Sequence, residues 1–109
     1  MRHVWNRERR RRPMRIGVHR YAVSIIARPD DDPAEIDTIR NTVEVIEVAV
    51  PSVRAVLLIH EALHGLLDDS GLDVSETMEE RIVRALAPRI AAFLKDNPAA
   101  VRELLRMLR

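Results

Sequence analysis

Two histidines and a glutamate near the middle of the chain are the residues best suited to chemistry. His60, Glu61 and His64 lie in the apolar segment VLLIHEALHGLL, residues 56–67, which has the length of a helix. Residues four positions apart lie one above the other on a helix, so His60 and His64 can present two imidazoles to one metal ion. Glu61 lies about 100° further round, where a general base for a zinc-bound water belongs.

The pattern His-Glu-x-x-His fixes only three positions, so chance matches are frequent. Here the motif lies inside an expected helix and follows apolar residues, which favours a metal site. A second face, about 120° away, carries large aliphatic residues, namely Ile59, Leu63, Leu66 and Leu67. We expect this aliphatic face to seat the helix in the core and the polar face to line a cleft.

A catalytic zinc site needs a third protein ligand and an open position for water. The chain has no cysteine, and no histidine follows His64, so a downstream carboxylate is expected. Glu79 and Glu80 lie at the start of the next expected helix. Glu80 lies at the flank of the apolar face of that helix, so we favour Glu80 and keep Glu79 as the alternative. Acids in a first helical turn also interact favourably with the helix dipole, so either glutamate has a purely structural explanation as well.

The 109 residues suit a single small domain preceded by a basic arm. Residues 1–15 carry seven arginines and one acid, whereas the rest of the chain carries eleven basic and sixteen acidic residues. We expect residues 1–13 to form a disordered arm and residues 14–109 to form the domain. The arm is a polyanion-binding segment, a solvated tail without a role, or a segment before a natural start at Met14, and we favour the last two. Nucleic acid is therefore not an expected partner except through the arm.

Hydrophobic periodicity predicts an α+β fold. Residues 14–27 alternate and predict one strand, or two with a break near residues 19–20, and a further strand is expected at 42–49, antiparallel to a neighbour. The motif helix should run from 52 to 67 and end in a turn at 68–73. Ser75 then caps a helix that continues to about Lys95 and is interrupted by Pro88. The last helix, 99–108, is amphipathic, and we expect its apolar side to join the core.

No apolar run approaches the length of a membrane span, and the arginine-rich N-terminus lacks the apolar stretch of a secretory signal. These observations predict a cytoplasmic protein that has no membrane partner.

With the segment His60–His64 followed by the helix that bears Glu79 and Glu80, the chain resembles the gluzincin metallopeptidases. Over residues 14–98 it looks most like the small phage-associated relatives of the ImmA/IrrE type, as residues 79–88 and 96–98 also suggest. The resemblance implies a small zincin-like domain in which short strands precede the motif helix. It also implies a zinc metallopeptidase, located in the host cytoplasm if the protein is phage-encoded, with zinc held by His60, His64 and Glu80 or Glu79, and with Glu61 as general base. The expected partner is a peptide or protein substrate.

A non-catalytic interaction module, with a structural zinc or none, is the competing hypothesis. A structural zinc is usually closed by a fourth protein ligand, for which Asp68 and Asp73 are candidates. The last helix or the basic arm would then carry the binding, and a homo-oligomer is possible under either hypothesis. For the enzyme, the sequence offers only His19 and Tyr21 as candidates to stabilise an oxyanion.

Overall fold

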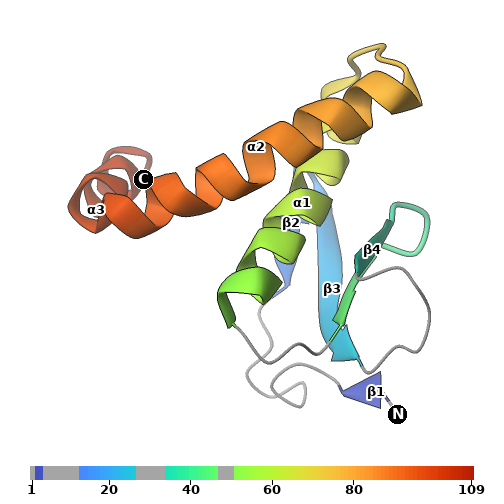
Figure 1. Cartoon of the computed structure of the whole chain (residues 1–109), viewed down its shortest axis with the longest axis horizontal. Helices are drawn as coiled ribbons and strands as arrows, with labels where there is room; N and C mark the ends of the chain where they lie inside the picture. The colour runs from blue at the N-terminus through green and yellow to red at the C-terminus, as the bar shows by residue number, and fades with distance from the viewer. Residues whose placement is uncertain (1, 4–12, 27–33, 47–50) are drawn as a thin grey trace.

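The computed structural model has an α+β architecture, as predicted, in which an N-terminal sheet is followed by three helices (Figure 1). It describes residues 2–3, 13–26, 34–46 and 51–109. The predicted disordered arm lies mostly outside this part of the chain. Within the arm the structure describes Pro13 and a two-residue strand, β1 (Arg2–His3), which pairs with β3.

The first predicted strand region is a β-hairpin. Strands β2 (Met14–Ile16) and β3 (His19–Ile26) pair antiparallel and are joined at Gly17 and Val18, two residues before the expected break. Gly17 has a φ of 60°, and a Cβ there would collide with the Asp69 carboxylate. Glycine is therefore needed at this turn both for its backbone conformation and for the close approach of Asp69.

Strand β5 (Thr42–Ile46) has two neighbours of opposite direction. It pairs antiparallel with β4 (Ala34–Asp37), as the predicted antiparallel neighbour requires, and parallel with β3 on its other side, which was not predicted. The sheet order is β1-β3-β5-β4, with β2 also on β3, so β4 is an edge strand among the described residues. Strand β4 was not predicted either, because only four residues form it before Asp37 starts a turn by accepting hydrogen bonds from the backbone of Ile39 and Arg40.

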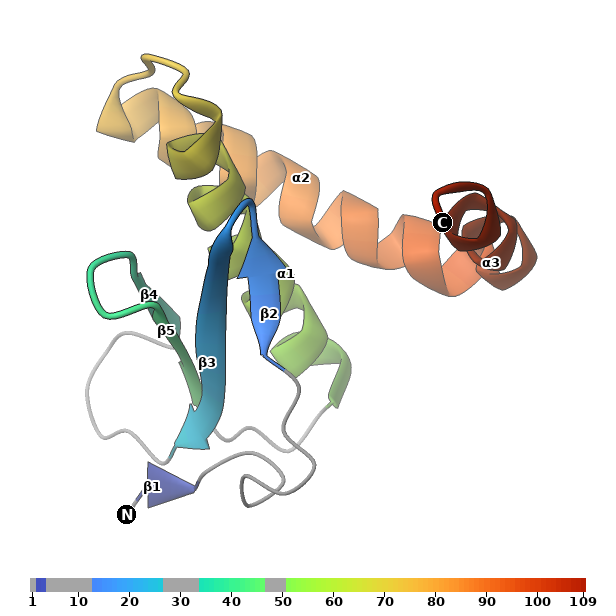
Figure 2. The same cartoon turned by 180° about the vertical axis from the view of Figure 1, so that it is seen from behind.

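The helix α1 (Pro51–Ser70) carries the His-Glu-x-x-His motif and lies between the sheet and α2 (Figure 2). It extends three residues past the predicted end, so Asp68 and Asp69 are helical, and Gly71 with a φ of 75° follows. The predicted aliphatic face is not the face on the sheet. Leu57 and Leu58 pack against the sheet core, Glu61 and Gly65 are the buried residues of α1, and Leu66 is 49% exposed. The helix α1 contacts the sheet on one side and α2 on another, so two of its faces are covered. A prediction based on one aliphatic face does not identify the second covered face.

The helix α2 (Glu76–Asp96) begins at the predicted cap, where the Ser75 side chain accepts a hydrogen bond from the backbone of Met78. It continues through Pro88 to Asp96 and crosses α1, burying Val83 and Ala87. This crossing brings the first turns of α2 alongside the motif on α1.

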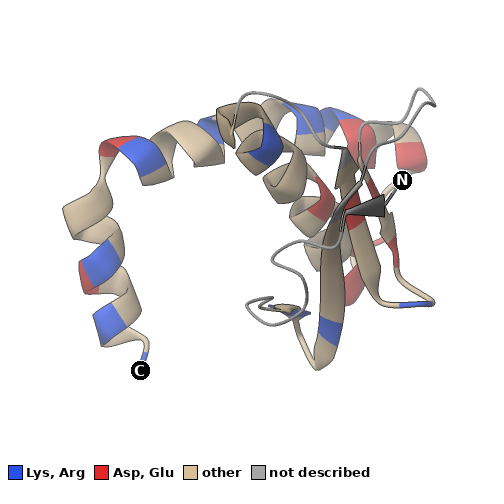
Figure 3. Cartoon of the chain, turned by 90° about the horizontal axis from the view of Figure 1, so that it is seen from below, with Lys and Arg blue, Asp and Glu red and all other residues tan. Residues whose placement is uncertain are grey.

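The last helix, α3 (Pro98–Met107), was predicted to join the core, and this prediction is wrong. It has no buried residue, and Leu104, Leu105 and Leu108 are exposed. Figure 3 shows α3 at the far end of α2, away from the strands. The helix is amphipathic, as predicted, but it follows the far end of the long helix α2 and therefore lies too far from the sheet to pack on it. None of the helices in the described part of the chain is long and apolar enough to span a membrane.

Candidate metal site

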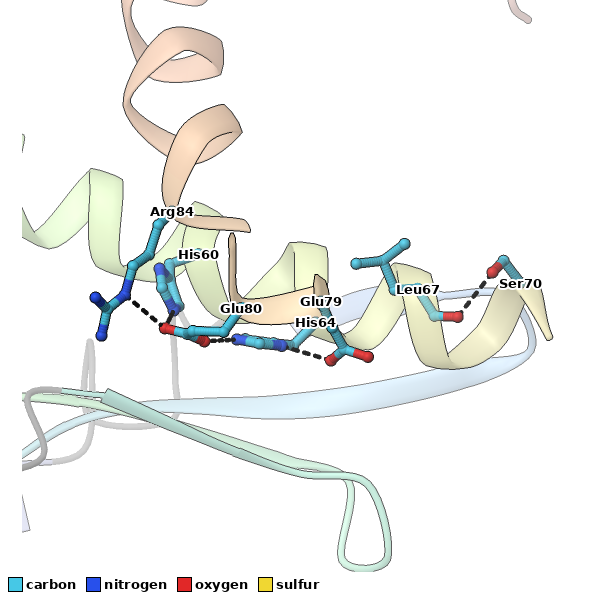
Figure 4. Close-up of polar contacts among 7 residues, drawn as sticks. All are labelled: His60, His64, Leu67, Ser70, Glu79, Glu80 and Arg84. Atoms are coloured by element: carbon cyan, nitrogen blue, oxygen red, sulfur yellow. Dashed lines mark hydrogen bonds and ion pairs between the residues drawn. The ribbon is translucent and has the colours of Figure 1, made fainter. Parts of the chain in front are cut away.

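Two helices supply the side chains of the candidate site, as the sequence predicted. His60 and His64 lie one turn apart on α1, and Glu79 and Glu80 lie in the first two turns of α2 (Figure 4). The Ser75 cap fixes where α2 begins, and therefore which of its residues face the histidines. Residues 15 or more positions apart in the sequence thus meet through the crossing of α1 and α2.

One ligand atom each from His60, His64 and Glu80 lie within 4.8 Å of one another. The Nε2 atom of His64 is 2.9 Å from Glu80 Oε1, and the Nε2 atom of His60 is 3.6 Å from Glu80 Oε2. In a tetrahedral zinc site with bonds of about 2.0–2.1 Å, ligand atoms lie about 3.3–3.4 Å apart. The two observed separations, which involve different oxygens of Glu80, bracket that value, so this group of three residues could hold a metal ion.

Glu79 contacts the opposite side of the His64 ring. Its Oε2 atom is 2.6 Å from His64 Nδ1. An ionised carboxylate can only accept a hydrogen bond, so the His64 ring can donate from Nδ1 to Glu79 and from Nε2 to Glu80. A metal ion bound at Nε2 would replace the hydrogen on that nitrogen and leave the Nδ1–H bond to Glu79 in place. This arrangement is typical of the carboxylate that orients a metal-binding histidine. Of the two glutamates that the sequence left open, Glu80 thus belongs to the group that could hold a metal ion, and Glu79 contacts the other ring nitrogen of His64.

The pKa values of the site differ according to their surroundings. Burial lowers the pKa of His60, which favours the neutral imidazole that a metal requires. Burial acts in the same direction on His64, but the hydrogen bond to Glu79 and the charges of Glu61 and Glu80 outweigh it and raise its pKa. Burial tends to raise the pKa of Glu80, but the hydrogen bond from Arg84 and the nearby histidines lower it. At neutral pH Glu80 is thus a carboxylate, the form that can bind a cation.

Glu61 is the buried acid of the site, with 7% of its surface exposed. Burial raises the pKa of its carboxyl group, and the charge of His64 and a hydrogen bond from the Ile36 backbone oppose that shift. A carboxylate with a raised pKa accepts a proton more readily near neutral pH, which is the property that a general base needs. Its position on α1 is the one that the helical spacing predicted.

These residues line a cleft of about 480 Å³. One wall is α1, the second is the edge strand β4, and the third is α2, and the cleft is lined by Ala34, Glu35, Ile36, Leu57, His60, Glu61, His64, Glu80 and Arg84. The volume lies in the range of sites for small molecules.

Other residues singled out from the sequence lie elsewhere. His19 is exposed and Tyr21 is buried in the sheet core, and neither lines this cleft. Among the described residues, Asp68 and Asp73 do not belong to a group that can hold a metal ion. Sequence reasoning missed Arg84, although its position four residues after Glu80 on a helix was a usable signal.

Comparisons with protein-family models, with curated proteins and with solved structures found no match.

Proposed function

We propose that this chain is a zinc-dependent metallopeptidase of the gluzincin type with a small zincin-like fold. The observation that carries the proposal is the meeting of His60, His64 and Glu80 at one point of a cleft, beside the buried Glu61. Two imidazoles and one carboxylate are a known ligand set for catalytic zinc.

The number of ligands supports a catalytic over a structural metal. A structural zinc is usually closed by four protein ligands, whereas the group found among the described residues has three. Three protein ligands leave a coordination position for water or substrate. The open cleft on the same side gives a substrate access to that position.

The residues would divide the reaction as follows. His60, His64 and Glu80 hold the metal, and Glu79 keeps the His64 ring in the required orientation. A zinc ion bound there would lower the pKa of a water molecule and polarise a carbonyl group. Glu61 takes a proton from the water as its oxygen adds to the carbonyl carbon of the substrate. Glu61 then passes that proton to the amide nitrogen as the C–N bond breaks.

The edge strand suggests how a peptide would lie. Ala34, Glu35 and Ile36 of β4 line the cleft opposite the motif helix, and β4 has no further strand beside it in the described sheet. An extended peptide can add to such an edge through backbone hydrogen bonds, here through groups other than the Ile36 N–H, which is bonded to Glu61. This would place a peptide bond between β4 and the side chains of α1.

The first test is the zinc content of purified protein by elemental analysis. We expect about one zinc per chain, lost in the His60→Ala/His64→Ala double variant and in Glu80→Gln. Glu76→Gln, in the first turn of the same helix but outside the cleft, is the matched control and should keep its zinc. Absence of zinc from the wild type after dialysis against zinc would refute the proposal.

The second test separates the metal from the chemistry. Glu61→Gln should keep the zinc but lose cleavage of a peptide library followed by mass spectrometry. Glu79→Gln should keep the fold but bind zinc about 10- to 100-fold more weakly, because His64 loses its orienting carboxylate. Cleavage by Glu61→Gln at the wild-type rate would show that Glu61 is not the base.

A further inference from the structure

Arg84 is a cation held at the wall of the cleft by one of the candidate metal ligands. Its Nε atom donates a hydrogen bond to Glu80 Oε2 at 2.9 Å, and the same oxygen lies 3.6 Å from His60 Nε2. Figure 4 shows the guanidinium group beside His60, at one end of the row of site side chains. The side chain is 75% exposed.

The cleft contains one basic side chain among several acids. Arg84 is its single arginine or lysine among the described residues, and the other charged lining groups are Glu35, Glu61 and Glu80. The guanidinium is planar and permanently charged, so fixing Nε also fixes the directions of the remaining donors. A group of this kind is suited to bind an oxygen anion.

Hydrolysis of a peptide bond creates such an anion. When water adds to the carbonyl carbon, the π electron pair moves to the carbonyl oxygen, which becomes negatively charged until the C–N bond breaks. Donors aimed at that oxygen stabilise the transition state. The sequence suggested His19 and Tyr21 for this role, but neither lines the cleft.

We propose that Arg84 is the oxyanion-binding residue of this site and that Glu80 both holds the metal and fixes the guanidinium. The inference rests on the proposed metallopeptidase function. Glu80 and Arg84 lie one turn apart on the same side of α2, so this helix would supply both a metal ligand and the oxyanion-binding group.

The competing explanation is an ordinary helical ion pair. Exposed glutamate–arginine pairs four residues apart are common and contribute little to stability. Such a pair would leave anion binding in the cleft unchanged when Arg84 is replaced. The test must therefore measure anion binding separately from zinc binding.

The experiment uses the full zinc-loaded chain and two small probes. Methylphosphonate carries tetrahedral anionic oxygens, whereas neutral imidazole binds through the metal alone, and isothermal titration calorimetry gives the affinity of each. In Arg84→Gln we expect methylphosphonate to bind about 10- to 100-fold more weakly, the loss typical of one charge-assisted hydrogen bond. Zinc and imidazole should bind as in the wild type.

Arg81→Gln is the matched control, because Arg81 is an exposed arginine of α2 that does not line this cleft. It changes the net charge equally and should leave methylphosphonate binding unchanged. Arg84→Lys keeps the charge without the planar fork and should fall between the wild type and Arg84→Gln.

Three results would overturn the inference. The first is equal methylphosphonate affinity in the wild type and Arg84→Gln. The second is a parallel loss of zinc or imidazole binding in Arg84→Gln, which would mean that Arg84 acts only through Glu80. The third is a wild-type chain that binds no zinc. That failure belongs to the proposed function, and it is recognised before any anion is added.

Discussion

Gly65 lies where α1 comes closest to the sheet, and replacing it with alanine tests the packing beneath the site. A Cβ atom at this position would lie 2.5 Å from Ile16 Cδ1 and 2.9 Å from Ile36 Cδ1. Non-bonded carbon atoms pack at about 3.5–4.0 Å, so both isoleucine side chains would have to move by about 0.5–1 Å or change rotamer. Ile16 belongs to the buried core and has little space in which to do so.

Two opposing effects set the expected change in stability. Alanine is favoured over glycine in a helix interior by about 1 kcal/mol. Over-packing a well-packed core costs about 1–3 kcal/mol. We therefore expect Gly65→Ala to lower the free energy of unfolding by about 1 kcal/mol. An exposed helical glycine would give a change of the opposite sign.

Urea unfolding followed by circular dichroism measures this change, and Ile16→Val provides the internal control. Valine lacks the Cδ1 atom that meets the new methyl group, so the cost of Gly65→Ala should shrink in the double variant. The coupling between the two substitutions should reach about 1 kcal/mol. A Gly65→Ala variant more stable than the wild type, or strictly additive effects, would refute the close approach.

Three further predictions follow from the fold. Tyr21 is the single tyrosine of the chain, and burial and the charges of Asp68 and Asp69 raise its pKa. The tyrosinate absorbance of the folded protein should therefore titrate above the usual pKa of about 10, and in urea the pKa should return to that value. As the pH rises, the phenol of the unfolded chain ionises before that of the folded chain, so the contribution of neutral Tyr21 to stability is complete below about pH 10 and is lost as the pH rises through the folded pKa. A titration midpoint at or below about 10 in the folded protein would contradict the raised pKa. Ser75→Ala should cost about 1 kcal/mol in urea unfolding because α2 loses its N-cap, and an unchanged midpoint would mean that the cap contributes nothing. Deleting residues 98–109 should leave the zinc content unchanged, since α3 buries no residue and lies away from the cleft, and loss of zinc would show that α3 supports the site.

Local patterns in the sequence were sufficient for the elements that depend on short-range interactions. The spacing of His60, Glu61 and His64 determines their arrangement on a helix, because helical geometry relates residues three and four positions apart. The start of α1 was predicted to within one residue, and the Ser75 cap of α2 was also predicted, since both depend on the chemistry of a few adjacent residues.

Only the tertiary structure decided how these elements combine. Glu79 and Glu80 are neighbours with the same chemistry, and it is the crossing of α1 and α2 that directs one to Nδ1 of His64 and the other to Nε2. The parallel pairing of β3 with β5, and the position of Arg84 beside Glu80 at the cleft, likewise depend on contacts that helical or strand periodicity does not encode.

The last helix illustrates the same limit. The spacing of its apolar residues correctly predicted an amphipathic helix, but α3 does not contact the core that it was expected to join. Amphipathicity indicates that a face favours burial, while the lengths and directions of the preceding helices determine whether a surface is there to cover it. The sequence by itself thus determined the helices and the chemistry they carry, and the packing of those helices on the sheet decided which side chains meet.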